Sequence, residues 1–210
     1  MDSFFDSSVV IHYASFAKLI KKPLTKKCYD YVKNKKYDFI LCHYVEGEIK
    51  RRVQKRRIMY REVLNKLVNP NHNFDKSSLF NSLSDRDKNF LKQIYEFFKN
   101  KDLDVAKKEL SEDQLIFEMR IENFFKFLVD DILVEEGSID KRILSIVKEN
   151  GYSHADCLVS TSAVQAQQER DIFSFVAADK HFSPNGYEFL EKDPRLKSYK
   201  FPKLNNLYFN

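Results

Sequence analysis

The chain has 210 residues, of which 43% are hydrophobic and 32% charged, and its formal net charge is +5. This length and composition allow a sizeable buried core and exclude an intrinsically disordered protein. The sequence holds no apolar run near the roughly 20 residues that cross a bilayer, and acids stand at positions 2 and 6, where a signal peptide would be basic. We therefore expect a cytoplasmic protein without a membrane partner.

The cysteines give no sign of a disulfide framework or a zinc site. Cys28, Cys42 and Cys157 are odd in number and widely spaced, which is typical of a protein from a reducing compartment. The histidines lack the pair spacing of a zinc site, so we expect packed or hydrogen-bonded histidine side chains.

The first 50 residues predict a strand, a helix and a second strand. Residues 3–12 form a short apolar run around Asp6, which is typical of a buried strand that runs into a turn. After Pro23, residues 24–36 have helical spacing, and the apolar residues 38–42 predict the second strand. This order favours a parallel β-α-β unit.

The middle of the chain predicts long helices. Residues 48–136 contain no glycine and a single proline, Pro70. Ser111 followed by Gln114 has the spacing of a capping box for the last of these helices. The expected helices span about 45–68, 85–100 and 112–134.

The last third returns to mixed α/β patterning. A helix is expected over 140–151, with Gly151 at its end, and another over 153–170. Residues 172–178 predict a strand that is closed by Asp179. The next segment, residues 179–204, holds three of the five prolines and predicts irregular structure with at most a short edge strand.

These elements predict an α/β fold in which helices flank a parallel-sheet sandwich and a large all-helical insertion interrupts it. We expect a single domain over 1–210, with its core at about 1–50 and 150–210 and the insertion at about 51–149. The apolar insertion offers a surface for a homodimer.

Four carboxylates are expected at one edge of this sheet, because functional groups collect at the carboxyl ends of parallel strands. Asp6 follows the first strand and Asp179 the last, while Glu48 and Asp156 lie in the first turns of helices. Clustered carboxylates repel one another unless a hard cation neutralises them. The pattern therefore predicts a Mg²⁺ or Mn²⁺ site suited to phosphodiester hydrolysis.

Each acid also has a structural interpretation. Asp156 has capping-box spacing from Ser153, Asp179 is a common turn former, and an isolated Glu48 on a charged helix is usually solvated. Asp6 is the hardest to explain in this way, because a carboxylate between apolar residues needs a partner or a cation.

The blocks that carry the acids, "FFDSSVVI", "ILCHYVEGEIKRRV", "HADCLVSTSA" and "FSFVAADKHF", resemble in order those of PIN-domain nucleases. The resemblance implies a PIN-like fold in which Asp6, Glu48, Asp156 and Asp179 are the catalytic, metal-binding acids and Ser8 is a helper hydroxyl. It also implies a metal-dependent endoribonuclease that leaves a 5′-phosphate.

The resemblance covers about residues 1–50 and 150–185, and the chain departs from the family pattern within it. Ala177 stands where the family usually has threonine, and His181 stands where a further acid is common. Glu46 competes with Glu48, which we favour because an apolar residue follows it on the helix.

A run of cations follows Glu48. Residues 50–61 hold seven Lys and Arg and no acid, and helical periodicity places Glu48, Arg52 and Lys55 on one face. A phosphate backbone could follow this face, although a solvated helix surface is the alternative. The expected nucleic-acid contacts are Ser8, Lys50, Arg51, Arg52, Lys55 and Arg56.

Other functions remain open. A non-catalytic RNA-binding or assembly module on the same fold would explain Ala177 and His181. A phosphatase that uses Asp6 as its nucleophile fits less well, because its pattern needs a second acid where Ser8 stands. Among nucleases, both a toxin with a protein antitoxin or inhibitor and a processing enzyme fit the sequence.

Overall fold

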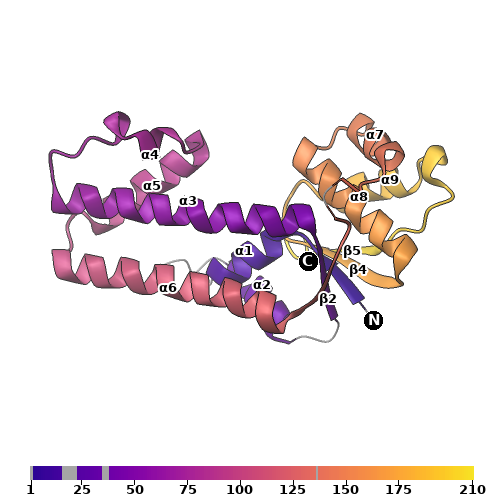
Figure 1. The fold of residues 1–210 in the computed structure, drawn as a ribbon, viewed down its shortest axis with the longest axis horizontal. Coiled ribbons are helices and arrows are strands. Elements are labelled where there is room, and N and C mark those ends of the chain that lie inside the picture. Colours follow the sequence, from indigo (N-terminus) through magenta and orange to yellow (C-terminus); the bar gives the residue numbers. More distant parts are fainter. Residues whose placement is uncertain (1, 16–22, 35–37, 136) are drawn as a thin grey trace. The chain divides into compact units, whose positions relative to one another are not determined.

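The computed structural model describes residues 2–15, 23–34, 38–135 and 137–210. The chain divides into two compact units, which are described separately: unit 1 comprises residues 1–49 and 120–210, and unit 2 comprises residues 50–119. Figure 1 shows their helices and strands.

Unit 1 is built on a five-stranded parallel sheet with the strand order β3-β2-β1-β4-β5. Its first strand, β1, pairs with β2 on one side and with β4 on the other, so the strand order reverses at β1. The expected α/β class and the expected parallel pairing are confirmed. The strands are β1 (Asp2–Phe5), β2 (Asp38–Cys42), β3 (Val129–Leu133), β4 (Ile172–Ala177) and β5 (Lys203–Asn206).

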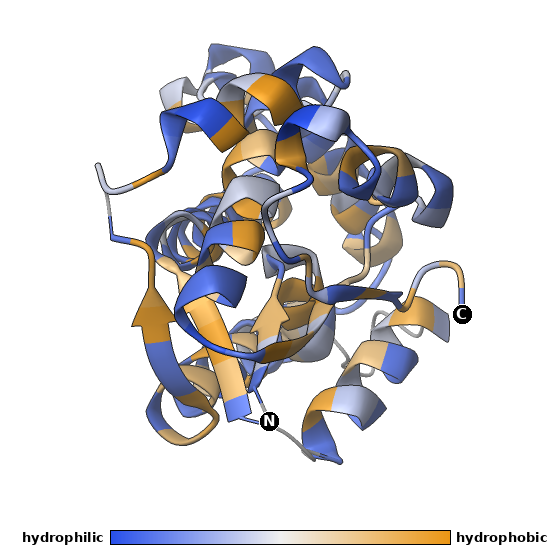
Figure 2. Ribbon diagram, turned by 90° about the vertical axis from the view of Figure 1, so that its right-hand side faces the viewer, coloured by the Kyte–Doolittle hydropathy of each residue, from blue (hydrophilic) through white to orange (hydrophobic). Residues whose placement is uncertain are grey.

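Helices cover both faces of this sheet. The rings of Phe4 and Phe175 pack 5.9 Å apart, and Tyr187 of α9 packs on Phe175 at the same ring distance. On the other face, the ring of Phe5 lies 6.0 Å from that of Tyr31 on α2. Burial on both faces explains why the three central strands β2, β1 and β4 are largely apolar without alternation; Figure 2 colours the strands by hydropathy. The helices that lie wholly in unit 1 are α1 (Ser7–Ser15), α2 (Pro23–Lys33), α7 (Lys141–Glu149), α8 (His154–Glu169), α9 (Pro184–Glu191) and the 3₁₀ helix η2 (Pro194–Leu196).

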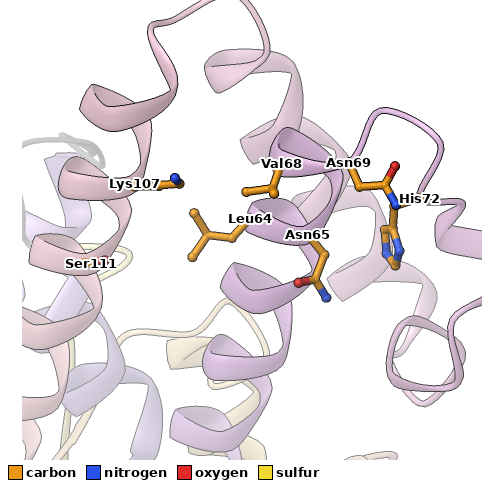
Figure 3. A pocket seen from close by; sticks show the side chains of 7 residues that line it. All are labelled: Leu64, Asn65, Val68, Asn69, His72, Lys107 and Ser111. Carbon is orange, nitrogen blue, oxygen red and sulfur yellow. The ribbon is translucent and has the colours of Figure 1, made fainter.

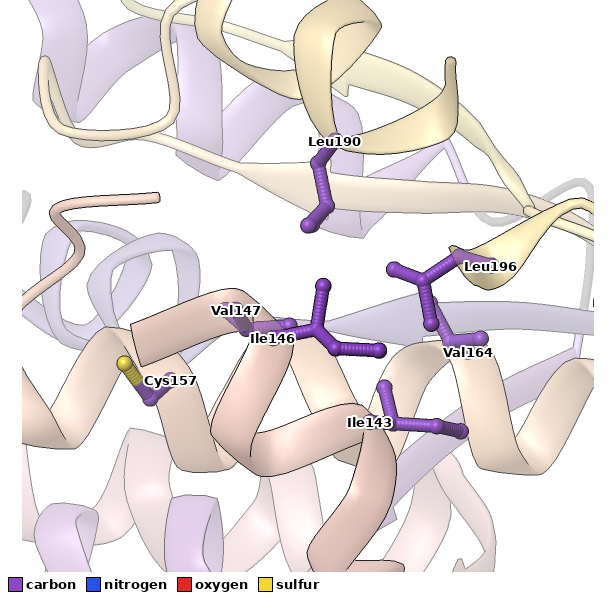
Figure 4. Close-up of a cluster of buried hydrophobic side chains, with 7 residues drawn as sticks. All are labelled: Ile143, Ile146, Val147, Cys157, Val164, Leu190 and Leu196. Atoms are coloured by element: carbon purple, nitrogen blue, oxygen red, sulfur yellow. The ribbon is translucent and has the colours of Figure 1, made fainter. Parts of the chain in front are cut away.

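A separate apolar cluster joins α7, α8 and the segment from α9 to η2 (Figure 4). The Asp140 side chain caps α7 by accepting the N–H groups of Arg142 and Ile143, and the helix is followed by Gly151 at φ +85°, as the sequence predicts. This packing holds α8, whose first turn carries Asp156, against its neighbours. The cluster consists of Ile143, Ile146, Val147, Cys157, Val164, Leu190 and Leu196.

Unit 2 is helical. It contains most of α3 and of α6, together with a connection that begins near Pro70. The helices expected over 45–68 and 85–100 are confirmed, because α3 ends at Val68 and the Ser84 side chain caps α5 by accepting the N–H of Asp87. The elements are α3 (His43–Val68), the 3₁₀ helix η1 (Phe74–Lys76), α4 (Ser78–Asn81), α5 (Asp85–Phe98) and α6 (Leu103–Phe127).

The helix expected over 112–134 is observed with other bounds, and the prediction of an all-helical segment over 51–149 is wrong. The helix is α6, and it begins earlier because the Asp102 side chain accepts the N–H groups of Asp104 and Val105. Ser111 lies inside α6, so its capping-box spacing marks no helix start. The residues after α6 form β3, which pairs with β2 in the sheet of unit 1.

Two shorter predictions also need correction. The apolar residues after Asp6 do not extend the first strand but form α1, because the chain turns into a helix directly after that side chain. The segment 179–204 is not irregular, since it contains α9, which Ser183 caps and which Pro184 opens. A proline in the first turn favours a helix rather than breaking it. The expected short edge strand is β5.

A buried ion pair stands inside unit 2. The Nη2 atom of Arg56 on α3 bonds Oδ2 of Asp113 on α6, and the two side chains are 6% and 3% exposed. The hydroxyl of Tyr60 donates to the same oxygen, and the guanidinium lies 4.3 Å from the centroid of the Phe117 ring. The pair joins α3 to α6.

We expect Arg56→Met or Asp113→Leu alone to lower the free energy of unfolding by about 3–5 kcal/mol, because each leaves a buried charge without its partner. The double variant should recover most of this loss. The measurement is the urea midpoint of the helical signal. Arg57→Met is the control, because the pair that Arg57 forms with Glu118 is exposed and such pairs contribute about 0–1 kcal/mol. Equal losses for Arg56→Met and Arg57→Met would contradict this prediction.

Candidate active site

Asp6 lies at the junction of β1 and α1 and is 5% exposed. Its N–H continues the sheet by donating to the carbonyl of Val176 at 2.9 Å, and its Oδ2 accepts the N–H of Ser8 at 3.0 Å. Asp6 therefore caps α1, where the unsatisfied N–H groups of the first turn favour a carboxylate. The position at the end of the first strand is as the sequence predicts.

Ser8 connects the ends of β1 and β4. Its hydroxyl donates to Oδ2 of Asp6 and accepts the N–H of Ala178 at 3.0 Å. Since β1 and β4 meet where the strand order reverses, this hydroxyl lies at the crevice where α/β sheets bind ligands. The hydroxyl proton is committed to Asp6, so Ser8 acts as a positioning residue in this structure.

The pKa of Asp6 is raised from 3.8 to about 7. Burial is the main cause, because it disfavours the charged form, and the hydrogen bond from the Ser8 hydroxyl opposes it. The negative charges of Glu48 and Asp179 raise the pKa further, which shows that both carboxylates act on Asp6. Any positive charge placed among these three carboxylates would be stabilised.

Glu48 borders this site. The hydroxyl of Ser7 donates to Oε2 of Glu48 at 2.8 Å. The Glu46 carboxylate instead lies 3.9 Å from Nδ1 of His43 at the start of α3. Ser7 was missed by sequence reasoning, although two serines directly after the acid were a visible signal.

His181 joins Asp156 to Asp179. Its Nδ1 atom lies 3.3 Å from Oδ1 of Asp179 and 3.7 Å from Oδ2 of Asp156. Asp156 interacts with Ser153 as its capping-box spacing predicts, because the Ser153 hydroxyl donates to it at 2.6 Å. Asp179 acts as the expected turn former, because its Oδ1 accepts the N–H of His181 at 2.9 Å. These bonds orient the two acids and leave oxygens of each near the imidazole.

Asn206 holds the loop that carries Asp179, and the sequence did not indicate it. Its side-chain amide is buried and donates to the carbonyls of Asp179 at 2.6 Å and Phe182 at 2.7 Å. Its oxygen accepts the N–H of Tyr208 at 3.0 Å. The last residue of β5 thus fixes the loop after β4.

The structure brings the predicted acids to one edge of the sheet. Asp6, Glu48 and Asp179 interact electrostatically, and Asp156 is linked to them through His181. Their oxygens are the ligand type that Mg²⁺ and Mn²⁺ prefer, and the disfavoured charge of buried Asp6 fits a cation. Among the described residues, no three His, Cys, Asp or Glu side chains are close enough to hold one metal ion, so binding one would require these side chains to move.

The predicted cationic face of α3 is largely paired within unit 2. Arg52 and Lys55 lie 2.6 and 3.2 Å from the two oxygens of Asp87 on α5, and Arg56 is buried against Asp113. Their charges are therefore balanced in this structure. The side chains of Lys50 and Arg51 are exposed.

Comparisons of this chain with protein-family models, curated proteins and solved structures found no match. Within the part of the chain that the structure describes, no helix combines the length and apolarity needed to cross a bilayer.

We expect Ser8→Ala to raise the pKa of Asp6 further above its present value of about 7, because the hydroxyl that stabilises the ionised carboxylate is lost. The measurement is the pH titration of the Asp6 carboxyl carbon by NMR. Ser7→Ala is the matched control, since the neighbouring hydroxyl bonds Glu48 instead. An unchanged or lower Asp6 pKa in Ser8→Ala would show that this hydrogen bond does not act on Asp6.

Asp6 also predicts a pH dependence of stability. Its folded-state pKa of about 7 lies above the ordinary value of 3.8, so between these values the folded protein binds a proton that the unfolded chain releases. The stabilisation is complete below about pH 4 and is lost as the pH rises through about 7, with a slope of at most about 1.4 kcal/mol per pH unit.

Urea unfolding at several pH values with a chelator present measures this effect. The free energy of unfolding of wild type minus that of Asp6→Asn should fall as the pH rises. Asp171→Asn, at an exposed acid just before β4, should show no such trend. A flat difference for Asp6→Asn would mean that the Asp6 pKa is not raised.

Proposed function

We propose that this protein is a divalent-metal-dependent endoribonuclease of the PIN-like type. The observation that carries the proposal is Asp6, a buried carboxyl with a raised pKa, at the reversal of strand order and under the influence of Glu48 and Asp179. A folded protein has little reason to bury a carboxyl at a crevice under the charges of two further acids unless a cation or a proton is used there.

The chain's own residues would divide the work as follows. Asp6, Glu48 and Asp179 would hold Mg²⁺ or Mn²⁺, with Asp156 as a further ligand. Such an ion, when bound, activates water and stabilises charge on phosphate oxygens.

The surrounding side chains keep these acids in place. Ser7 and Ser8 hold Glu48 and Asp6 through their hydroxyl protons, and Asn206 fixes the Asp179 loop. His181 holds Asp156 and Asp179 on either side of its Nδ1 atom.

RNA is the proposed substrate because the resemblance to PIN-domain nucleases favours it. Hydrolysis that leaves a 5′-phosphate does not use the 2′-hydroxyl, so the chemistry alone selects neither RNA nor DNA. A protein antitoxin or inhibitor, a homodimer and a cytoplasmic location remain predictions of the sequence.

A non-catalytic RNA-binding module is the second candidate. The specific observation in its favour is His181, whose imidazole lies within 3.7 Å of both Asp156 and Asp179. A protonated imidazole there would replace a cation as the partner of the two acids. Such a module would bind RNA without binding Mn²⁺ at this edge.

We expect Asp6→Asn to reduce Mn²⁺-dependent cleavage of single-stranded RNA on the order of 100-fold or more, because the central ligand is lost. RNA binding in the presence of a chelator should change little. The measurements are single-turnover cleavage on a gel and calorimetric titration with Mn²⁺. Asp171→Asn is the control, because it removes an exposed acid outside the carboxylate group. Comparison of Glu48→Gln with Glu46→Gln identifies the ligand, and only Glu48→Gln should lose activity.

Two results would overturn the nuclease proposal. One is wild-type protein that neither binds Mn²⁺ nor cleaves RNA, which would favour the module if RNA binding persists. The other is cleavage that Asp6→Asn leaves unchanged, which would point to a contaminating nuclease or a different site.

A further inference from the structure

The net charge of the chain resides in unit 2. Residues 50–119 contain 16 Lys and Arg and 11 Asp and Glu, an excess of +5, whereas the rest of the chain has 20 of each. Unit 2 therefore accounts for the whole net charge of +5. Such a local excess favours a polyanionic partner for unit 2.

An exposed ridge runs along the part of α3 in unit 2. Its residues recur every three or four positions, and the five that lie in α3 share one helix face. Asn69 follows directly after the helix, and all six residues are exposed. The ridge carries no acid, and its first and last arginines lie about 15 Å apart along the helix axis. Arg57 pairs with Glu118 on the surface through two hydrogen bonds of 2.6 and 2.7 Å, and this pair would have to open for Arg57 to bind a phosphate. The ridge consists of Arg51, Gln54, Arg57, Arg61, Asn65 and Asn69.

This ridge differs from the face that the sequence suggested. Arg52, Lys55 and Arg56 bond acids of α5 and α6 inside unit 2, whereas Arg51 and Arg61 point to solvent. The cationic surface is therefore rotated around α3 relative to the expected one.

The ridge ends at a groove of about 560 Å³ between α3 and α6. Figure 3 shows Leu64 and Val68 pointing towards the helix that carries Lys107, and Val68 is 57% exposed. Oδ1 of Asn69 accepts the N–H of Asn71 at 3.0 Å, which leaves the amide N–H groups of Asn69 as donors. The groove is lined by Leu64, Asn65, Val68, Asn69, His72, Lys107 and Ser111.

We propose that unit 2 binds single-stranded RNA on this ridge and receives an unstacked base in the groove, an inference that rests on the proposed ribonuclease function for its choice of RNA. Phosphates would follow Arg51, Arg57 and Arg61. A base would lie against Leu64 and Val68, with its edge within reach of the amides of Asn65 and Asn69.

Two features favour RNA over an acidic protein. Side-chain amides present both donors and acceptors, which match base edges, and a volume of about 560 Å³ accommodates a nucleoside. A single strand is required because only an unstacked base enters a groove.

Fluorescence anisotropy with a labelled single-stranded RNA in EDTA tests the proposal without cleavage. Arg51→Glu/Arg61→Glu should weaken binding about tenfold or more and reduce the slope of log K against log salt by about 1.4, the value for two phosphate contacts. The matched control is Lys76→Glu/Arg86→Glu, which makes the same charge change in unit 2 on η1 and α5. It should weaken binding less than about threefold.

The groove is tested by Asn65→Ala/Asn69→Ala with oligo(A), oligo(C) and oligo(U). The variant should change the ratio of affinities among the three while the salt slope stays constant. Circular dichroism confirms that each variant is folded.

Equal losses of RNA affinity in the ridge and control variants would show that the ridge is not the RNA-binding surface. An unchanged affinity ratio in the asparagine variant would overturn the groove. Equal affinity for polyglutamate would identify a general anion surface or an acidic protein partner, and preference for single-stranded DNA would identify a DNA surface. Failure of the ribonuclease proposal can be distinguished from failure of the binding proposal. In that case no cleavage is observed, while the binding results in EDTA still agree with the ridge and the groove.

Discussion

The candidate site depends on one hydroxyl group. The Ser8 hydroxyl donates to Asp6 and accepts the backbone N–H of Ala178. It therefore connects the ends of β1 and β4, where the strand order reverses. Parallel strands on either side of such a point leave a crevice. This bridge adds a side-chain contact to the sheet bonds that already connect the two acid-bearing segments.

Hydrogen bonds also hold the other acids at this edge of the sheet. Each acid is fixed by a short polar residue next to it or by a backbone N–H group, as Ser7 fixes Glu48 and Ser153 fixes Asp156. These contacts hold like charges near one another. Burial is the main cause of the raised pKa of Asp6, and the charges of Glu48 and Asp179 add to it. The site is therefore electrostatically favourable for a positive charge, although its side chains would have to move to hold a metal ion.

Local patterns predicted what local physics determines. Apolar runs predict the buried strands β1 and β2, and they predict that Asp6 follows β1 and Asp179 follows β4. Caps and the absence of glycine predict the helices α3 and α5. The strand β3 was missed because its sequence contains two acids. Their partners come from elsewhere: Asp130 accepts the N–H of Phe39 on β2, and Asp131 pairs with Arg170.

Contacts between residues that are distant in the sequence also escape prediction at the candidate site. No sequence pattern shows that Asn206 reaches back to the carbonyl of Asp179 or that Arg52 and Lys55 meet Asp87 on a different helix. Periodicity identified a cationic helix, but only the packing of unit 2 determines which side of it faces solvent.

The amide of Asn206 has a consequence for synthesis. The loop bearing Asp179 has its anchor in β5, and among the five strands of the sheet β5 is the last in chain order. A nascent chain still lacking β5 lacks this anchor for the backbone of the loop. This contact between the loop and the strand can form only after residue 206 has been synthesised.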